Sequence, residues 1–217
     1  MAEYFEGLYA ETSCKWGLKP DFILAHFLEL FPKGVVLDLG AGEGRNAIFL
    51  AEKGFEVECI DISKTAIDRC IRLAKERNVV INASVGDLRD FKIAEEKYSL
   101  IIAAGASLNF LRKNEIENVA KKITRGVKKG GFVFVSVASA DDPHCKKLRA
   151  QQVPTEENTF YVPRMGTYVH YFTYKEIKRL FSGMQTIIHL KGLELDFHNT
   201  PHYHNIIYYL GKKNESG

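Results

Sequence analysis

Three glycines at alternate positions in the segment 40–44, GAGEG, could bring the backbone close to a bound ligand. They follow the apolar run Val35–Leu39, which includes one acid, Asp38, and is typical of a strand buried on both faces. Glycine lacks a Cβ atom, so the backbone can turn sharply and pass next to a ligand. The stretch Arg45–Lys53 contains neither Gly nor Pro and is predicted to be a helix, whose first N–H groups would point at that ligand.

The spacing of these glycines indicates which kind of ligand they suit. A dinucleotide site uses G-x-G-x-x-G, with its third glycine where Arg45 stands, whereas this chain has G-x-G-x-G after an acid. The tighter spacing resembles motif I of the class I S-adenosylmethionine (SAM) methyltransferases. A strand–turn–helix corner without a ligand is the alternative interpretation of this segment alone. The resemblance implies SAM binding by residues of the motif and of the first helical turn, namely Asp38, Gly40, Ala41, Gly42, Gly44 and Asn46.

A second acidic residue lies one strand further along the chain. Glu56–Asp61, EVECID, reads as another buried strand that ends in a carboxylate, about 20 residues beyond the glycines, where ribose hydroxyls are bound. Ile62 then offers an apolar side chain to the adenine face. The family commonly places an acid that reaches the adenine amino group where this chain has Asp87 and Leu88. For Asp87, the alternative is a plain turn residue.

Alternating strands and helices must position these residues. Apolar runs at Tyr98–Ala103 and Phe132–Ala138 predict further buried strands, and Lys113–Lys128 predicts an amphipathic helix between them. Such alternation predicts an α/β fold with a doubly wound, Rossmann-like sheet that is mostly parallel. Two last strands, Thr186–Leu195 and Ile206–Leu210, are predicted to form an antiparallel pair at one edge. The whole is the seven-stranded arrangement of the class I methyltransferases.

Composition limits the setting in which this chain works. Its 217 residues, 46% of them hydrophobic, are enough to bury one core, so a single domain over 1–217 is expected. A formal net charge of +3 is too small to indicate nucleic acid, and no apolar stretch is long enough to indicate a membrane span. Acids near the N-terminus, and four cysteines without C-x-x-C spacing, favour a cytoplasmic protein with free thiols. We expect a monomer or a homodimer.

A closer resemblance covers residues 42–63, GEGRNAIFLAEKGFEVECIDIS, and especially the pair Arg45-Asn46. This stretch is similar to the tellurite-resistance (TehB-like) methyltransferases, which make volatile or less toxic methylated products from oxyanions of tellurium and selenium. The resemblance implies methyl transfer from SAM to a small soft acceptor, such as tellurite, selenite or a thiol. Two alternatives stay open: an O-, N- or C-methyltransferase of a metabolite, and a SAM-binding module without transferase activity.

Topology predicts where the acceptor binds. Ligands of a parallel sheet bind beyond the carboxyl ends of its strands. The connection Ser139–Phe172, too long for an ordinary loop, leaves the carboxyl end of the fifth predicted strand, and Asp196–His204 joins the last two strands on the same face. We therefore predict as catalytic residues His202, His204 and Arg45, and as acceptor-binding residues Asp141, His144, Cys145, Arg164, His170 and His198.

Two further expectations concern metal ions and the segments that cover the site. No close-spaced ligand set such as H-x-x-x-H occurs, so the histidines are expected to bind the acceptor or handle protons, and no metal site is predicted. Residues 139–172 are predicted to be an insertion over the active site. The aromatic-rich residues 1–20 are predicted to form either a lid over the site or a helix lying on the core.

Overall fold

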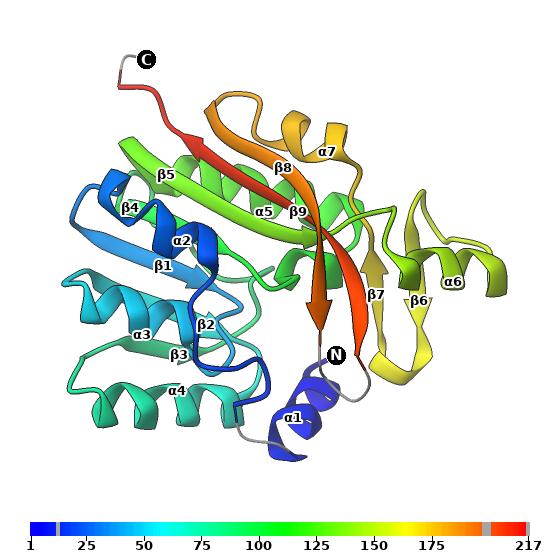
Figure 1. The fold of residues 1–217 in the computed structure, drawn as a ribbon, viewed down its shortest axis with the longest axis horizontal. Coiled ribbons are helices and arrows are strands. Elements are labelled where there is room, and N and C mark those ends of the chain that lie inside the picture. The colour runs from blue at the N-terminus through cyan, green and yellow to red at the C-terminus, as the bar shows by residue number, and fades with distance from the viewer. Residues whose placement is uncertain (12–13, 197–200, 216–217) are drawn as a thin grey trace.

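One seven-stranded sheet organises the molecule. The computed structural model describes residues 1–11, 14–196 and 201–215, and its sheet has the strand order β3-β2-β1-β4-β5-β9-β8 (Figure 1). The strands are β1 (Val35–Leu39), β2 (Glu56–Asp61), β3 (Asn82–Val85), β4 (Tyr98–Ala103), β5 (Val127–Ala138), β8 (Gln185–Asp196) and β9 (His202–Lys212). The first five run parallel to one another, and β9 runs antiparallel to both β5 and β8. The predicted doubly wound α/β fold with an antiparallel C-terminal strand is confirmed.

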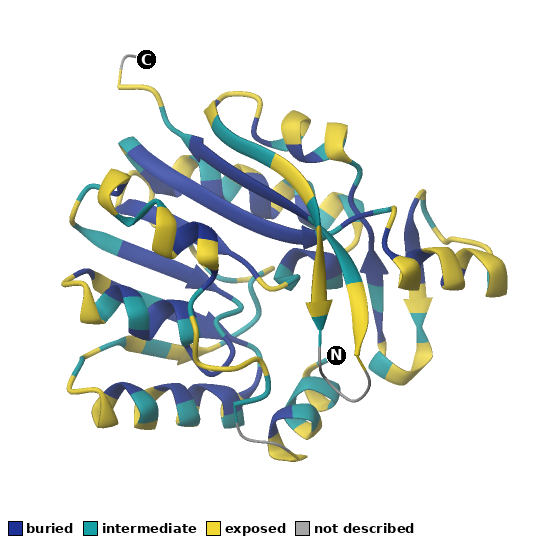
Figure 2. Ribbon diagram, viewed as in Figure 1, coloured by how far each residue is buried: buried dark blue, intermediate teal, exposed yellow. Residues whose placement is uncertain are grey.

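Helices cover both faces of the sheet. One face packs against α2 (Phe22–His26), α3 (Arg45–Glu52) and α4 (Lys64–Glu76). The other packs against α5 (Lys113–Gly126) and α7 (Tyr174–Leu180). The central strands are therefore buried on both sides, whereas the helices expose their outer faces (Figure 2). This double burial explains why the central strands read as continuous apolar runs rather than as alternating patterns.

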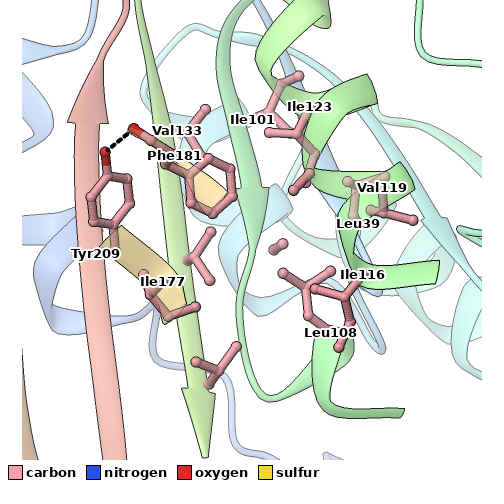
Figure 3. Close-up of a cluster of buried hydrophobic side chains, with 14 of the residues drawn as sticks. Leu39, Ile101, Leu108, Ile116, Val119, Ile123, Val133, Ile177, Phe181 and Tyr209 are labelled. Carbon is pink, nitrogen blue, oxygen red and sulfur yellow. Dashed lines mark hydrogen bonds between the residues drawn. The ribbon is translucent and has the colours of Figure 1, made fainter. Parts of the chain in front are cut away.

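The core between the sheet and α5 is the larger of the two. All six residues of β4 are buried, and Ile101 from this strand lies with Ile116 and Ile123 from α5 in one cluster (Figure 3). At the other end of that cluster, the Tyr209 hydroxyl donates a hydrogen bond of 3.3 Å to the carbonyl of Phe181. This bond ties the end of α7 to β9, which fixes the antiparallel pair against the rest of the sheet.

The junction between α5 and β5 differs from the prediction. The helix ends at Gly126 instead of Lys128, and the strand begins at Val127 instead of Phe132, so the pair Gly130-Gly131 lies within the strand. A Cβ atom on Gly131 would lie 2.9 Å from the Lys128 carbonyl oxygen and 3.0 Å from that of Ser99. The glycine is therefore required by close backbone contact with β4, where the strand register shifts, and not by a helix end.

Residues 139–172 form a small unit of their own beyond the carboxyl end of β5 (Figure 1). The unit contains α6 (Pro143–Gln151) and a separate antiparallel pair, β6 (Thr159–Val162) and β7 (Thr167–His170). Its own apolar cluster holds it together and consists of Cys145, Leu148, Phe160, Val169 and Tyr171. The segment predicted as a polar connection thus carries regular structure, because its scattered aromatic residues can be buried together.

The N-terminal helix α1 (Ala2–Glu11) does not pack on the sheet. It lies at the carboxyl end of the strands, beside α4 (Figure 1). Within the described ranges, no helix is both long and apolar enough to cross a bilayer. The position of α1 makes it part of the functional site.

Candidate functional site

A cavity of about 860 Å³ opens at the carboxyl ends of the parallel strands. This volume lies within the range of about 300–1,000 Å³ that small-molecule sites occupy. Its wall is built by the glycine loop after β1, by residues 104–107 after β4, by the N-terminal segment and by the unit 139–172. Ten residues that the sequence analysis singled out for SAM or for the first helical turn line it, namely Asp38, Gly40, Ala41, Gly42, Arg45, Asn46, Asp61, Ile62, Asp87 and Leu88.

The glycine loop follows the inner surface of the cavity in a left-handed conformation. Gly40 and Gly42 have φ values of +76° and +57°. A Cβ on Gly42 would lie 2.5 Å from the Tyr9 hydroxyl, so any side chain at this position would clash with Tyr9. Gly44 is different, because its Cβ would overlap Cys70 Sγ on α4. It lies outside the cavity wall, and the structure gives it a helix-packing role instead of the predicted cofactor contact.

Asp61 is held rigidly at the cavity by the backbone around it. Its Oδ2 accepts a hydrogen bond of 2.8 Å from the Gly42 N–H, and its Oδ1 accepts one of 2.9 Å from the Ser63 N–H. Burial raises the pKa of this carboxyl, and these N–H bonds oppose the shift. The parallel pairing of β1 with β2 therefore joins the two predicted motifs into one site.

Asp38 is the buried charge that most needs a ligand. Its side chain is 2% exposed, and among the residues that the structure describes Oδ2 finds no hydrogen-bond partner. Burial raises the pKa of the carboxyl to about 7, although the Arg45 charge acts in the opposite direction. A buried acceptor without a donor is costly unless a ligand supplies one. The ammonium group of the SAM methionine would supply such a donor, so the residues present fit SAM.

Arg45 and Asn46 occupy the first turn of α3. The Asn46 Oδ1 accepts a hydrogen bond of 2.8 Å from the Asp21 N–H, which fixes the chain entering α2 next to the cavity. Burial raises the pKa of Asp21, Asp38 and Glu194, and the positive charge of Arg45 opposes each of these shifts, so this cation faces several carboxyls. These neighbours explain why a cation stands at a helix N-terminus, where the helix dipole disfavours it.

Asp87 lines the cavity but is already engaged. Both of its carboxylate oxygens accept hydrogen bonds of 3.0 Å from Arg89 Nε, and Oδ1 also accepts one of 2.9 Å from the Arg89 N–H. In the latter bond, the Asp87 side chain accepts from the backbone two residues further along, as is typical of an aspartate in a turn. Geometry thus supports the turn role of Asp87 while leaving it in the cavity wall.

We call α1 together with Trp16, Gly17 and Pro20 the roof, because it covers the cavity. Phe5, Tyr9 and Trp16 line the cavity from this side. The Trp16 Nε1 donates a hydrogen bond of 3.2 Å to the Tyr9 hydroxyl, and the Phe5 ring meets the Phe110 ring edge-on at 4.8 Å between centroids. Glu6 fastens α1 to the start of α4, since its Oε2 accepts a bond of 2.7 Å from the Ser63 hydroxyl.

The opposite wall carries a polar cluster from the unit 139–172 and the β8–β9 pair. Asp142 Oδ2 lies 3.1 Å from His204 Nδ1 and accepts a bond of 2.8 Å from the Asn205 N–H. The Asp142 carboxylate raises the pKa of His204, although burial opposes this shift. Beside this pair, His144 Nδ1 lies 2.6 Å from the Tyr171 hydroxyl, and burial lowers the pKa of His144. His144 and His204, both predicted for the acceptor, therefore meet at one cavity wall.

Four of the residues predicted for acceptor binding lie outside the cavity wall formed by the described residues. Asp141 is exposed and pairs with Lys191 Nζ at 2.5 Å. Cys145 is buried in the apolar cluster of the unit 139–172. His170 is fully buried with its Nδ1 2.8 Å from the Thr159 hydroxyl, and Arg164 lies over the Tyr4 ring at 5.9 Å. His202 lies outside the wall with its Nε2 3.0 Å from His204 Nε2, and His198 is outside the described residues.

Several residues of the cavity wall were not predicted. They come from the unit 139–172 and from β8, and they are Asp142, Tyr171, Glu194 and Asp196. For Asp142 a signal existed: an Asp followed by Pro143 is typical of a helix N-cap, which fixes the acid in place. Asp141, the residue predicted instead, is exposed next to this cap.

Known proteins resemble this chain in its first half. The methyltransferase domain family matches residues 36–131, which run from β1 into β5. The probable SAM-dependent methyltransferase TehB of Haemophilus influenzae is 28% identical over 111 residues, covering 51% of this chain and 38% of TehB. The putative methyltransferase YqeM of Bacillus subtilis is 30% identical over 109 residues, covering 50% of this chain and 44% of YqeM. The chain thus spans less than half the length of these two relatives.

Solved structures show the same fold over nearly all of the chain. The crystal structure of TehB from Haemophilus influenzae matches with a TM-score of 0.70 at 18% identity, covering 89% of this chain and 62% of that one. A SAM-dependent methyltransferase from Methanosarcina mazei matches with a TM-score of 0.73 at 20% identity, covering 91% and 99%. Residues 36–131 are thus similar to a methyltransferase domain family, and the chain has the fold of solved SAM-dependent methyltransferases, TehB among them.

Proposed function

We propose that this protein transfers the methyl group of SAM to a small molecule inside the roofed cavity, and that the acceptor is a soft one: a thiol, or an oxyanion of tellurium or selenium. The observation that carries this proposal is a single cavity of about 860 Å³ shared by the glycine loop and the polar wall. A site built only to hold SAM would not need room for a second group of polar side chains. The likeness to TehB supports the choice of acceptor.

SAM, when bound, supplies an electrophilic methyl group on a sulfonium cation. In our proposal Asp38 accepts hydrogen bonds from its ammonium group, and Asp61 accepts them from its ribose hydroxyls. The glycine loop lets the backbone approach the ligand closely. The roof excludes water, and apolar side chains such as Phe110, Met165 and Val169 line the acceptor space. Because opposite charges disappear during transfer to an anion, a dry and well-aligned site accelerates the reaction.

Arg45 supports an anionic acceptor, because it is a cation in a cavity wall whose other charged residues are mostly acidic. It lies in the same cavity as the SAM residues and would orient an oxyanion or a thiolate. A soft nucleophile of this kind needs no general base.

The pair His204–Asp142 also favours a second candidate, an O-methyltransferase of a small metabolite. A histidine held by a buried carboxylate at 3.1 Å is the arrangement that accepts a proton from a hydroxyl group. A hydroxyl acceptor needs this help, whereas a thiolate or selenite does not. The identity of the methylated product therefore distinguishes the two candidates.

The test is a transfer assay with methyl-labelled SAM and a panel of tellurite, selenite, thiols and hydroxyl metabolites, read by headspace and liquid mass spectrometry. We expect a thioether from a thiol, a methylated oxyanion from tellurite or selenite, and little turnover with the hydroxyl compounds. Methylation confined to hydroxyl compounds would establish the second candidate. SAM binding by calorimetry without transfer to any acceptor would instead indicate a binding module. The four cysteines are free thiols, and we propose that the protein acts in the cytoplasm.

A further inference from the structure

The tips of β8 and β9 bring together three side chains whose ligand atoms converge. His202 Nε2 lies 3.0 Å from His204 Nε2, and Asp196 Oδ2 lies 4.0 Å from the first and 3.6 Å from the second. A point about 2.1 Å from all three atoms exists within this triangle, and about 2.0–2.2 Å is the length of Zn–N and Zn–O bonds in proteins. We propose that Asp196, His202 and His204 bind a divalent transition-metal ion, with Zn²⁺ as the best fit.

The sheet register builds this site before any ion arrives. Asp196 and His202 are direct partners across the antiparallel pair, so their side chains lie on one face. His204 lies two residues further along β9 and shares that face. The ligands therefore come from two hydrogen-bonded strands and are held by the main chain. No metal site was predicted from the sequence because these three residues lack the H-x-x-x-H spacing of a helical site. They come together only when β8 pairs with β9.

Asp142 gives independent support for a metal at this position. It holds His204 through Nδ1 at 3.1 Å, which leaves Nε2 to face His202 and Asp196. Asp142 is itself buried and fixed by the N–H groups of His144 and Asn205, each at 2.8 Å. A carboxylate on the second nitrogen of a metal-binding histidine is the usual outer-shell arrangement, since it fixes the ring and its tautomer. Two imidazole Nε2 atoms facing each other are likewise explained when both lone pairs point at a cation.

The place of the site suggests its role, which rests on the proposed function. Asp196 and His204 line the same cavity as the SAM residues. Three protein ligands leave an open coordination position, as in catalytic rather than structural zinc sites. In our proposal that position binds the sulfur, selenium or oxygen atom of the acceptor and holds it toward the methyl group. Imidazole and carboxylate ligands suit zinc and its neighbours in the first transition row.

Metal binding can be measured without methyl transfer. The purified protein is treated with a chelator, titrated with Zn²⁺ by calorimetry, and titrated in parallel with Co²⁺, whose visible spectrum reports coordination geometry. We expect one ion per chain and a tetrahedral or five-coordinate Co²⁺ spectrum. His204→Ala and His202→Ala should abolish that spectrum, and Asp142→Asn should weaken Zn²⁺ binding about 10–100-fold. His26→Ala, an exposed histidine on α2, is the matched control and should bind as wild type does.

The outcomes separate this inference from the proposed function. No stoichiometric Zn²⁺ binding, or binding that His204→Ala leaves unchanged while its circular dichroism matches wild type, would overturn the metal site. Loss of the Co²⁺ spectrum in a His202→Ala protein that still binds SAM with wild-type affinity would support it without any assay of turnover. Full transfer by the chelated enzyme would refute the role in acceptor binding and leave methyl transfer established.

Discussion

Replacing Asp38 by Asn tests two effects of one buried carboxyl: the stability that its burial costs the fold and the affinity for SAM that its charge contributes. The substitution removes the charge and keeps the shape of the side chain. The carboxyl is 2% exposed, and burial raises its pKa from 3.8 to about 7. Arg45 lowers the pKa, whereas Asp61 raises it further. Cys59 on the neighbouring strand is the register partner of Asp38 and brings no charge of its own, because its hydrogen bond with Cys70 and its burial raise the pKa of its thiol.

The size of the effect follows from the pKa shift. One pKa unit corresponds to about 1.4 kcal/mol, so a shift from 3.8 to about 7 corresponds to roughly 4 kcal/mol of folding free energy. Below about pH 4 the folded and unfolded chains both hold the proton, and the carboxyl costs no stability. From about pH 4 to 7 only the unfolded chain releases it, so the wild-type protein loses about 1.4 kcal/mol per pH unit from this group. Above about pH 7 the loss is complete and constant.

Urea unfolding without SAM, at pH values from about 4 to 8, measures this effect. The Asp38→Asn variant lacks the loss, so its stability relative to wild type should increase by roughly 4 kcal/mol across that range. At about pH 8 the same variant should bind SAM more weakly by about 1.5–3 kcal/mol, because it cannot form a charge-assisted bond with the ammonium group. A stability difference independent of pH would refute the burial argument. Unchanged SAM affinity by calorimetry would refute the contact with the ammonium group.

Three further substitutions test other contacts of the site. Gly44→Ala should destabilise the fold by about 1–3 kcal/mol in urea, since the new Cβ overlaps Cys70 Sγ; a loss confined to calorimetric SAM binding would instead return Gly44 to the cofactor site. Asp61→Ala should weaken SAM binding by about 1.5–3 kcal/mol, and an unchanged dissociation constant would show that the ribose assignment is wrong. Arg45→Ala should fold normally and lower kcat/KM for an anionic acceptor by about tenfold or more, so steady-state kinetics equal to wild type would remove Arg45 from the site.

The sheet was predictable because its signals are local and agree with one another. Glu56–Asp61 and Tyr98–Ala103 were predicted with the bounds that the structure has. Tyr98–Ala103 is buried throughout and therefore leaves a nearly continuous apolar run. The antiparallel pairing of the last two strands was predicted correctly, but both strands are longer than predicted. β9 begins at His202, and its first residues are polar because they leave the core and face the cavity or solvent.

The polar wall was only partly predictable, because residue type does not show which way a side chain points. His170 and His204 read alike in the sequence, yet one is enclosed by Thr159 and Glu176 and the other faces the cavity. Asp141 and Asp142 are adjacent, and only the helix cap that begins α6 decides which of them turns inward. Distinguishing such pairs requires the register of β9 against β8 and the packing of the unit 139–172, which neither periodicity nor composition contains.

The roof and the predicted ribose contact share one residue, and this has a kinetic consequence. The Ser63 hydroxyl donates a hydrogen bond to Glu6 on α1, and the Ser63 N–H donates one to Asp61. A movement of Glu6 or Asp61 therefore changes the position of Ser63 and, through it, of the other residue. A ligand bound at Asp61 would steady Ser63 and keep α1 in place, and the product would leave only after that connection breaks. We therefore expect departure of product, rather than the methyl-transfer step, to set the rate of turnover. The rate would then fall in proportion to the viscosity of the solvent, and Glu6→Ala would make it faster and less sensitive to added glycerol.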